Sequence, residues 1–164
     1  MQQILAKDPK YVPALMVSAL LAERKGAVDE AVQTCQKVLS IYPLFAPAMR
    51  QLALLYSHSQ RPSDLDKAYD LAEKARVSLP DDLELAKTLG LLAYGRKDYN
   101  RSMLLLREYA KKSGDDGEAF YYLGMDYYKL KQPGPCKKAL RRALDLHIAD
   151  PLEGQAQGIL KELK

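Results

Sequence analysis

The chain has 164 residues, a length that suits a single domain with a sizeable hydrophobic core. Hydrophobic residues make up 48% and charged residues 28%, which excludes a disordered chain, and two cysteines with two histidines are too few for a disulfide scaffold or a zinc site. The net charge of +4 arises after residue 82, where the chain has fifteen Lys and Arg residues and eleven Asp and Glu residues. This excess is too small to predict nucleic-acid binding. No apolar run approaches the roughly 20 residues of a membrane span and the first residues lack the shape of a signal peptide, so a soluble segment is expected.

Several series of residues recur every 34 residues, with one interval of 37. Four of them are Pro9, Pro43, Pro80 and Gly114; Leu15, Met49, Ala86 and Phe120; Ala19, Ala53, Gly90 and Gly124; and Ala22, Tyr56, Ala93 and Tyr127. A fifth series is Ala31, Ala68, Ser102 and Cys136, in which the longer interval comes one step earlier. The three extra residues therefore lie between Tyr56 and Ala68.

Segment 1–11 is expected to be one of two things. It is either the end of the second helix of a preceding repeat, whose beginning is missing from the chain, or a short N-terminal capping helix. The repeats that follow are 12–45, 46–82 (with the insertion), 83–116 and 117–150. Each predicts two helices, because apolar and small residues recur at i, i+4 and i+7 on both sides of a turn. In the fourth repeat the expected break is Gln132–Pro135.

The second helix of each repeat is expected to start near a residue suited to a cap or first turn. These residues are Asp29, Asp66, Asn100 and Pro135. The first two of these helices should stop at Tyr42 and Leu79, because a proline follows each. Segment 151–164 predicts an amphipathic C-terminal capping helix, with Asp150 as its cap and Pro151 as its first residue.

This pattern resembles the tetratricopeptide repeat, a 34-residue helix–turn–helix unit with small residues where its helices cross. The resemblance covers about residues 12–148 and departs from the family in the absence of tryptophan and in Lys97 and Lys131, which replace the turn glycine. It implies an all-α fold, a right-handed α-solenoid whose first helices line a concave groove. In the family this groove commonly holds an extended peptide or a helix of a partner.

The cysteines, the histidines and one pair of aspartates, which could serve in catalysis or metal binding, are expected to have structural roles. Cys35 and Cys136 are expected in the core, and His58 and His147 on the surface or at helix ends. The pair Asp115–Asp116 lies in a turn and is expected to cap a helix. No catalytic residue, metal site or cofactor is predicted, so the chain is expected not to be an enzyme.

The predicted binding residues lie on the faces of the first helices opposite the packing stripe. They are Met16, Leu20, Arg24, Arg50, Leu54, Lys87, Leu91, Tyr94, Tyr121, Met125, Tyr128 and Lys129. Tyrosine is common in binding hot spots, and the chain has eleven tyrosines against two phenylalanines. An alternative is that the leucines of this set and Tyr128 pack between adjacent repeats instead of binding a partner. The basic cluster Lys137–Lys138 and Arg141–Arg142 is interpreted as a solvated helix face.

The sequence therefore predicts a non-enzymatic scaffold or adaptor that binds a protein or peptide partner, with cations that can orient an acidic segment. The pattern of Lys, Asn and Arg by which some members of the family grip acidic chaperone C-termini does not match in either register. Two alternatives remain: a regulatory or assembly domain cut from a larger protein, and a self-association module that forms homo-oligomers. No nucleic-acid partner and no membrane insertion are expected.

Overall fold

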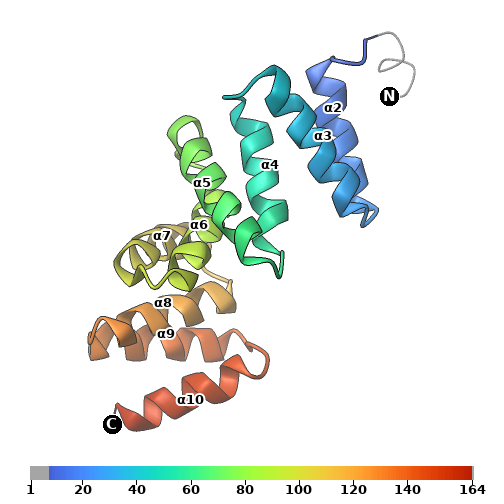
Figure 1. Ribbon diagram of the computed structural model, residues 1–164. Helices are drawn as coiled ribbons and strands as arrows, with labels where there is room; N and C mark the ends of the chain where they lie inside the picture. Colours follow the sequence, from blue (N-terminus) through green and yellow to red (C-terminus); the bar gives the residue numbers. More distant parts are fainter. Residues whose placement is uncertain (1–7, 164) are drawn as a thin grey trace. The chain divides into compact units, whose positions relative to one another are not determined.

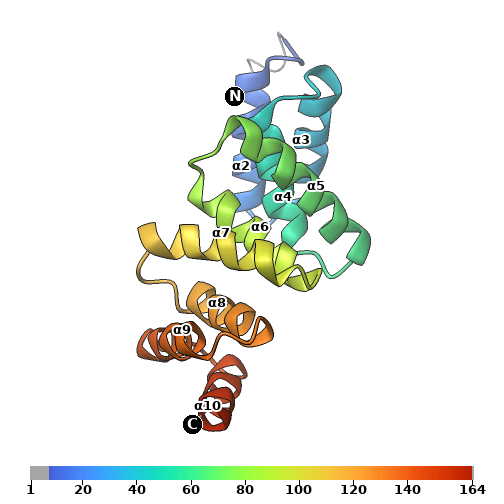
Figure 2. The same cartoon turned by 90° about the vertical axis from the view of Figure 1, so that its left-hand side faces the viewer.

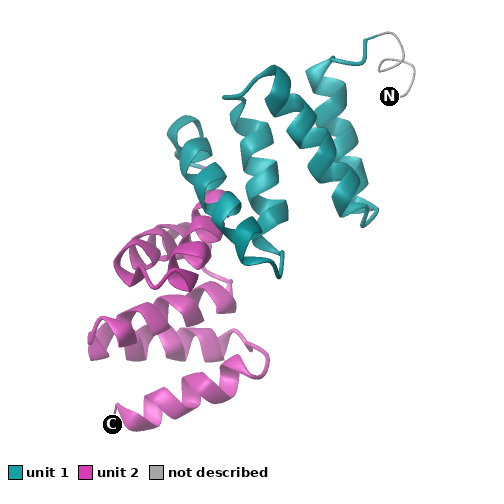
Figure 3. Cartoon of the chain, in the orientation of Figure 1, with its two compact units in different colours: residues 1–81 teal, residues 82–164 magenta. Residues whose placement is uncertain are grey.

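The computed structural model describes residues 8–163, so residues 1–7 of the predicted N-terminal helix lie outside the described part of the chain. Every regular element within residues 8–163 is an α-helix, which confirms the predicted all-α class (Figures 1 and 2). The helices divide into two compact units, residues 1–81 and residues 82–164 (Figure 3). No helix in residues 8–163 combines the length and the apolar character that crossing a membrane requires.

Unit 1 consists of two helical hairpins. Its helices are α2 (Val12–Arg24), α3 (Val28–Ile41), α4 (Ala46–Ser57) and α5 (Pro62–Ser78). The helix α2 packs against α3, α4 packs against α5, and α3 and α4 join the hairpins. One buried cluster consists of Leu15, Val38 and Ala48, and another of Ala22, Ala31 and Leu55. Because both clusters combine α2, α3 and α4, the first hairpin buries its apolar face against the second.

The three extra residues of the second repeat lengthen a helix instead of a loop. The helix α5 has 17 residues, against 14 in α3 and 14 in α7 (Tyr99–Lys112). It begins at Pro62, one turn before the predicted start near Asp66, and that prediction is therefore wrong. Proline suits the first turn of a helix, since its missing N–H would have no partner within the helix.

Unit 2 consists of two hairpins and one further helix. Its helices are α6 (Leu83–Gly95), α7, α8 (Gly117–Lys129), α9 (Pro133–Asp145) and α10 (Leu152–Glu162). One buried cluster includes Tyr121 and Leu140, and the α10 side chains Leu152 and Ile159 pack against it. The helix α10 therefore covers one end of the core of unit 2. It begins at Leu152, one residue later than predicted, and no side chain caps it.

Small residues lie where the two helices of a hairpin cross. Gly90 and Gly124 are buried, and a Cβ atom added to them would lie 2.9 Å from Leu106 and 2.5 Å from Leu140. The in-register residues of unit 1 are Ala19 and Ala53, both fully buried. The helices can approach this closely only because these positions carry little or no side chain.

A residue in the left-handed conformation follows three of the first helices. These residues are Gly26, Lys97 and Lys131, with φ of 75°, 64° and 56°. In each turn the amide of the next residue donates to the carbonyl five residues back, at 2.8–3.0 Å. This is the hydrogen-bond pattern of a Schellman turn. The turn keeps its geometry where lysine replaces glycine.

Aspartates cap three helices of unit 2. Asp82, Asp98 and Asp116 accept hydrogen bonds from backbone amides at the starts of α6, α7 and α8, at 2.9, 3.2 and 3.0 Å. The cap of α7 is thus Asp98, and Asn100 lies inside the helix. The helix α9 begins at Pro133, so the predicted break at Gln132–Pro135 is too long: its prolines lie in the first turn of the helix.

Candidate functional site

The predicted binding residues of α2 form a stripe that leaves apolar side chains exposed. Met16, Leu20 and Arg24 lie at i, i+4 and i+8. Leu20 and Arg24 are exposed, whereas Met16 is half-buried and packs against the cluster of Leu15, Val38 and Ala48. Leu20 is 42% exposed, and the neighbouring Val17 and Leu21 are 43% and 42% exposed. Leu21 was not in the predicted set, because it does not belong to the i, i+4 and i+8 series of Met16, Leu20 and Arg24 that defined the face. The helix α2 therefore exposes three large apolar side chains in a little more than one turn.

The other predicted residues of unit 1 lie on α4. Arg50 and Leu54 are both half-buried. Next to Arg50, the amide of Gln51 donates a hydrogen bond of 2.7 Å to the carboxylate of Glu23 on α2. Gln51 is buried and Glu23 is half-buried, so this bond is partly shielded from water and links α2 to α4.

Four tyrosines of unit 2 form a series of edge-to-face ring contacts. Tyr94 of α6 lies 5.6 Å from Tyr99 of α7 and 5.0 Å from Tyr122 of α8, and Tyr121 lies 5.2 Å from Tyr122, between ring centroids. Burial and the neighbouring tyrosines raise the pKa of Tyr94 to about 12, so its phenol is neutral at physiological pH. Tyr94 and Tyr122 are only half-buried and keep part of their surface open.

Two predicted groove tyrosines make hydrogen bonds to α10. Tyr121 donates to Gln155, and Tyr128 donates to the carboxylate of Glu162 at 2.8 Å. Both partners lie 34 residues further along the chain, so α10 takes the place of the first helix of a next repeat. Tyr121 is 3% exposed. The prediction that Tyr121 lines a binding groove is therefore wrong, because helix α10 of the same chain covers it.

The two remaining predicted residues of the α6–α8 face are partly in the core. Leu91 packs against the cluster of Leu106 and Leu123, and Met125 packs against the cluster that α10 covers. Both are half-buried. Their positions combine packing within the unit with a limited accessible surface.

The predicted cations of unit 2 have neighbours within the unit. Lys87 lies 2.8 Å from a carboxylate oxygen of Asp116 and 3.3 Å from one of Glu118. Burial lowers the pKa of Lys87, but these two carboxylates outweigh it, and the pKa is raised. Lys129 is exposed and lies 5.9 Å above the ring of Tyr128. Lys87 therefore stabilises the α6–α8 contact and is already neutralised.

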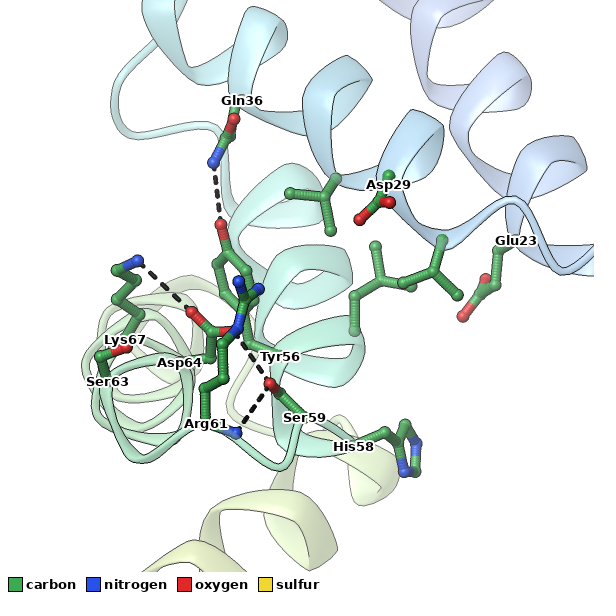
Figure 4. A pocket seen from close by; sticks show the side chains of 13 residues that line it. Glu23, Asp29, Gln36, Tyr56, His58, Ser59, Arg61, Ser63, Asp64 and Lys67 are labelled. Atoms are coloured by element: carbon green, nitrogen blue, oxygen red, sulfur yellow. Dashed lines mark hydrogen bonds and ion pairs between the residues drawn. The ribbon is translucent and has the colours of Figure 1, made fainter.

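Unit 1 also contains an open pocket of about 610 Å³, lined by α2–α5 (Figure 4). On one wall, Gln36 donates to the hydroxyl of Tyr56 at 2.8 Å. Near the start of α5, Asp64 accepts hydrogen bonds from Ser59 at 2.9 Å and from Arg61 at 2.7 Å. Asp64, the buried carboxylate of this lining, is thus paired with Arg61 and also lies 3.4 Å from the ammonium of Lys67.

The residues that could carry catalysis have the structural roles predicted for them. Cys35 and Cys136 are buried free thiols, and burial together with the charge of Glu23 raises the pKa of Cys35 to about 11. His58 and His147 are exposed at helix ends, and Asp116 caps α8. No group of three or more potential metal ligands occurs in the described part of the chain.

One buried carboxyl group has no counterpart in the other repeats. Asp126 is completely buried, and one of its oxygens accepts a hydrogen bond of 2.6 Å from Ser102. The other oxygen has no hydrogen-bond partner within residues 8–163. Burial raises the pKa of Asp126 to about 7. The group is enclosed in the core, so it bears on stability and not on the binding of a ligand.

Comparison with known proteins gives two kinds of similarity. Residues 14–44 and 118–147 match the family model described as tetratricopeptide repeat. A solved structure titled MamA AMB-1 has a TM-score of 0.80 and 19% identity over 95% of this chain and 88% of that chain. MamA MSR-1 gives 0.75 and 19%, over 93% of this chain and 84% of that one. No curated protein matches the sequence.

A third structure, titled MamA 41-end from Desulfovibrio magneticus RS-1, has a TM-score of 0.72 and 18% identity, and covers 93% of this chain and 82% of that chain. At these identities the likeness concerns the fold. It confirms an α-solenoid built of helix–turn–helix repeats.

Proposed function

Because the chain contains tetratricopeptide repeats, we propose that it is a non-enzymatic scaffold that binds a protein partner through the faces of its first helices. Repeats of this kind bind through surface area instead of reaction chemistry. The buried thiols and the exposed, isolated histidines support a binding role over a catalytic one.

The observation that carries the proposal is the apolar stripe on α2. Val17, Leu20 and Leu21 are each more than 40% exposed, with the half-buried Met16 beside them. Contiguous exposed apolar surface of this kind is typical of interaction sites. We infer that the stripe packs against apolar side chains of a partner helix or peptide.

Arg24 and Arg50 are the predicted cations of unit 1. Arg24 is exposed one turn after Leu20, and Arg50 is half-buried on α4. We propose that they orient a partner segment that carries carboxylates near its apolar residues. In unit 2, Tyr94, Met125 and Lys129 remain in the proposed binding set, and Tyr121 and Lys87 leave it.

The experiment compares proteins captured from lysate by the wild type and by the double variant Val17→Ser/Leu20→Ser. The matched control is Val77→Ser/Leu104→Ser, which changes apolar residues that are 84% and 53% exposed on second helices. Circular dichroism checks that all three proteins keep the same helix content. We expect a partner that the wild type and the control recover and the α2 variant loses.

Recovery of the same proteins by all three would reject α2 as the binding face. Light scattering on the same proteins tests the alternative of self-association. A molar mass that rises with concentration in the wild type and stays monomeric in the α2 variant would identify a second copy of the chain as the partner.

A further inference from the structure

A second pocket lies on unit 2, away from the face that carries Tyr94 and Met125. It has a volume of about 420 Å³, with α8 between walls from α7 and α9. Its apolar lining includes Phe120, Leu123 and Tyr127 from α8. Leu123 belongs to the buried cluster between α7, α8 and α9, so the core fixes the shape of the floor.

Four cations border this apolar floor. Arg107 and Lys111 come from α7, and Lys138 and Arg142 come from α9. Each pair has i, i+4 spacing, so the two cations of a pair lie on the same face of their helix. All four are exposed, and no carboxylate is among the described residues that line the pocket.

Three of the four cations have no partner in the described part of the chain. Arg107, Lys111 and Lys138 form no ion pair or side-chain hydrogen bond with any residue in 8–163. Only Arg142 is engaged: it donates to the carbonyl of Gly114 and lies 5.9 Å from the ring of Phe120. Like charges at i, i+4 weaken a helix, so two such pairs facing one pocket are unfavourable until an anion binds.

We propose that this pocket binds an acidic peptide segment that inserts an apolar side chain, an aromatic one above all, between its own carboxylates. The floor provides the apolar contact, and the border provides attraction from both sides. This site is distinct from the α2 stripe of the proposed function, and either one can fail without the other.

The shape of the pocket favours a peptide over a membrane or a nucleic acid. The apolar groups lie recessed below the cations, whereas a membrane-binding surface projects its apolar side chains beyond them. A double-stranded nucleic acid would be attracted by the cations, but its bases are stacked inside the duplex, and its phosphates and sugars would leave the apolar floor unfilled. A side chain of a peptide can fill the floor while its neighbouring residues reach the border.

The probe is a fluorescein-labelled heptapeptide with phenylalanine at its centre and three acidic residues on each side. Fluorescence anisotropy measures its affinity for the full chain. A second peptide with glycine at the centre tests the apolar insertion. We expect saturable binding of the first peptide, at least about tenfold weaker binding of the second, and a loss of affinity as salt increases.

Two variants with equal net charge separate the position of the charges from their number. Arg107→Glu/Lys138→Glu reverses one cation on each wall, and Lys37→Glu/Lys74→Glu reverses two exposed cations of unit 1. We expect the first variant to weaken binding about tenfold or more and the second to change it less than about threefold. A third variant, Ala110→Leu, fills the pocket without changing charge and should weaken binding of the phenylalanine peptide alone.

Three results would overturn the proposal. The first is no saturable binding of the phenylalanine peptide into the millimolar range, and the second is equal weakening by both charge variants. The third is binding to vesicles of equal parts phosphatidylcholine and phosphatidylserine, or to a single-stranded oligonucleotide, with no binding of the peptide. Circular dichroism confirms that each variant is folded, so a loss of binding reports on the pocket.

Discussion

Asp126 departs from the repeat in both chemistry and burial. The in-register residues of the other repeats are Leu21, Leu55 and Leu92, so a carboxyl group stands where the chain elsewhere has leucine. Ser102 satisfies one oxygen, and the other has no hydrogen-bond partner within residues 8–163. A buried carboxyl group without full hydrogen bonding is unfavourable when it is ionised.

The raised pKa of Asp126 makes stability depend on pH. The pKa rises from its ordinary value of 3.8 to about 7 on folding, because burial disfavours the charged form. The folded state therefore holds a proton that the unfolded state releases, and this contribution to stability falls as pH rises from about 4 to about 7. We expect Asp126→Asn to be more stable than the wild type at pH 8, by about 2–4 kcal/mol, and close to it at pH 4.

The measurement is urea unfolding of both proteins across this pH range, followed by circular dichroism. Asp126→Leu restores the residue of the other repeats and should show the same loss of pH dependence. Stability curves of wild type and variants that run parallel from pH 4 to pH 8 would contradict the prediction.

The turn lysines are a second deviation at the residue scale. Lys97 and Lys131 have positive φ, which is unfavourable for a residue with a Cβ atom. We expect Lys97→Gly to stabilise the chain by about 0.5–1 kcal/mol and Gly26→Lys to destabilise it by about 1 kcal/mol. Thermal unfolding measures both. The control Lys74→Gly lies within helix α5, where glycine should destabilise by about 1 kcal/mol. A loss of stability in Lys97→Gly as large as in the control would refute the prediction.

At the scale of the helix, the crossing point of each hairpin matches residue sizes across the two helices. Gly124 faces Leu140 and Gly90 faces Leu106 in unit 2, whereas Ala19 and Ala53 occupy the crossing in unit 1. The residues in register with the two leucines are Cys35 and Ala72. The smaller crossing residue thus occurs with the larger residue on the second helix.

A double-mutant cycle tests this match. Gly124→Ala places a Cβ atom 2.5 Å from Leu140 and should cost about 1–3 kcal/mol of stability. Leu140→Ala leaves a cavity and should cost about 2–5 kcal/mol. We expect the double variant to lose at least about 1 kcal/mol less than the sum of the two, because the added methyl group occupies part of the cavity.

Chemical denaturation provides the free energies for the cycle. Gly158→Ala in α10 is the control, because a Cβ atom at Gly158 meets no atom within 4 Å. It should leave stability unchanged or raise it. Strict additivity of the two crossing substitutions would show that the residue sizes are not matched.

For the molecule as a whole, the sequence predicts the structural features that recur in every repeat and misses those that occur in a single repeat. The 34-residue spacing locates the hairpins and their crossing residues, since helical period and small residues recur in each unit. It places the extra residues of repeat two between Tyr56 and Ala68, and it does not show that α5 is longer than α3 and α7. The choice between loop and helix depends on local bonds of Asp64 to Ser59 and Arg61, which no other repeat contains.

The candidate site was harder to predict than the fold for the same reason. The faces of the first helices follow from spacing, but the cover that α10 places over Tyr121 comes from outside the four repeats. From the sequence, Lys87 was predicted to be available to a partner. The structure pairs it with Asp116, which lies 29 residues later in the turn before α8. The basic cluster of α9 predicts a solvated surface, because the cations of α7 that face it lie about thirty residues earlier in the chain.

The role of α10 yields a prediction for the whole of unit 2. In an array of repeats each helix pair is stabilised by its neighbours, so loss of the terminal cover should spread inward with decreasing effect. Ile159→Asp puts a charge into the contact with the cluster of Tyr121 and Leu140 and should destabilise the unit by about 2 kcal/mol. Gln157→Asp adds the same charge on the exposed side of α10 and is the control.

Hydrogen exchange measured by mass spectrometry follows the effect along the chain. We expect faster exchange in α8 and α9 of the Ile159→Asp protein, a smaller increase in α6 and α7, and no change in the control. Tyr128 should become more accessible at the same time, since its bond to Glu162 depends on the position of α10. Faster exchange confined to α10 itself would show that α10 is an appendage and that the core of unit 2 is complete without it.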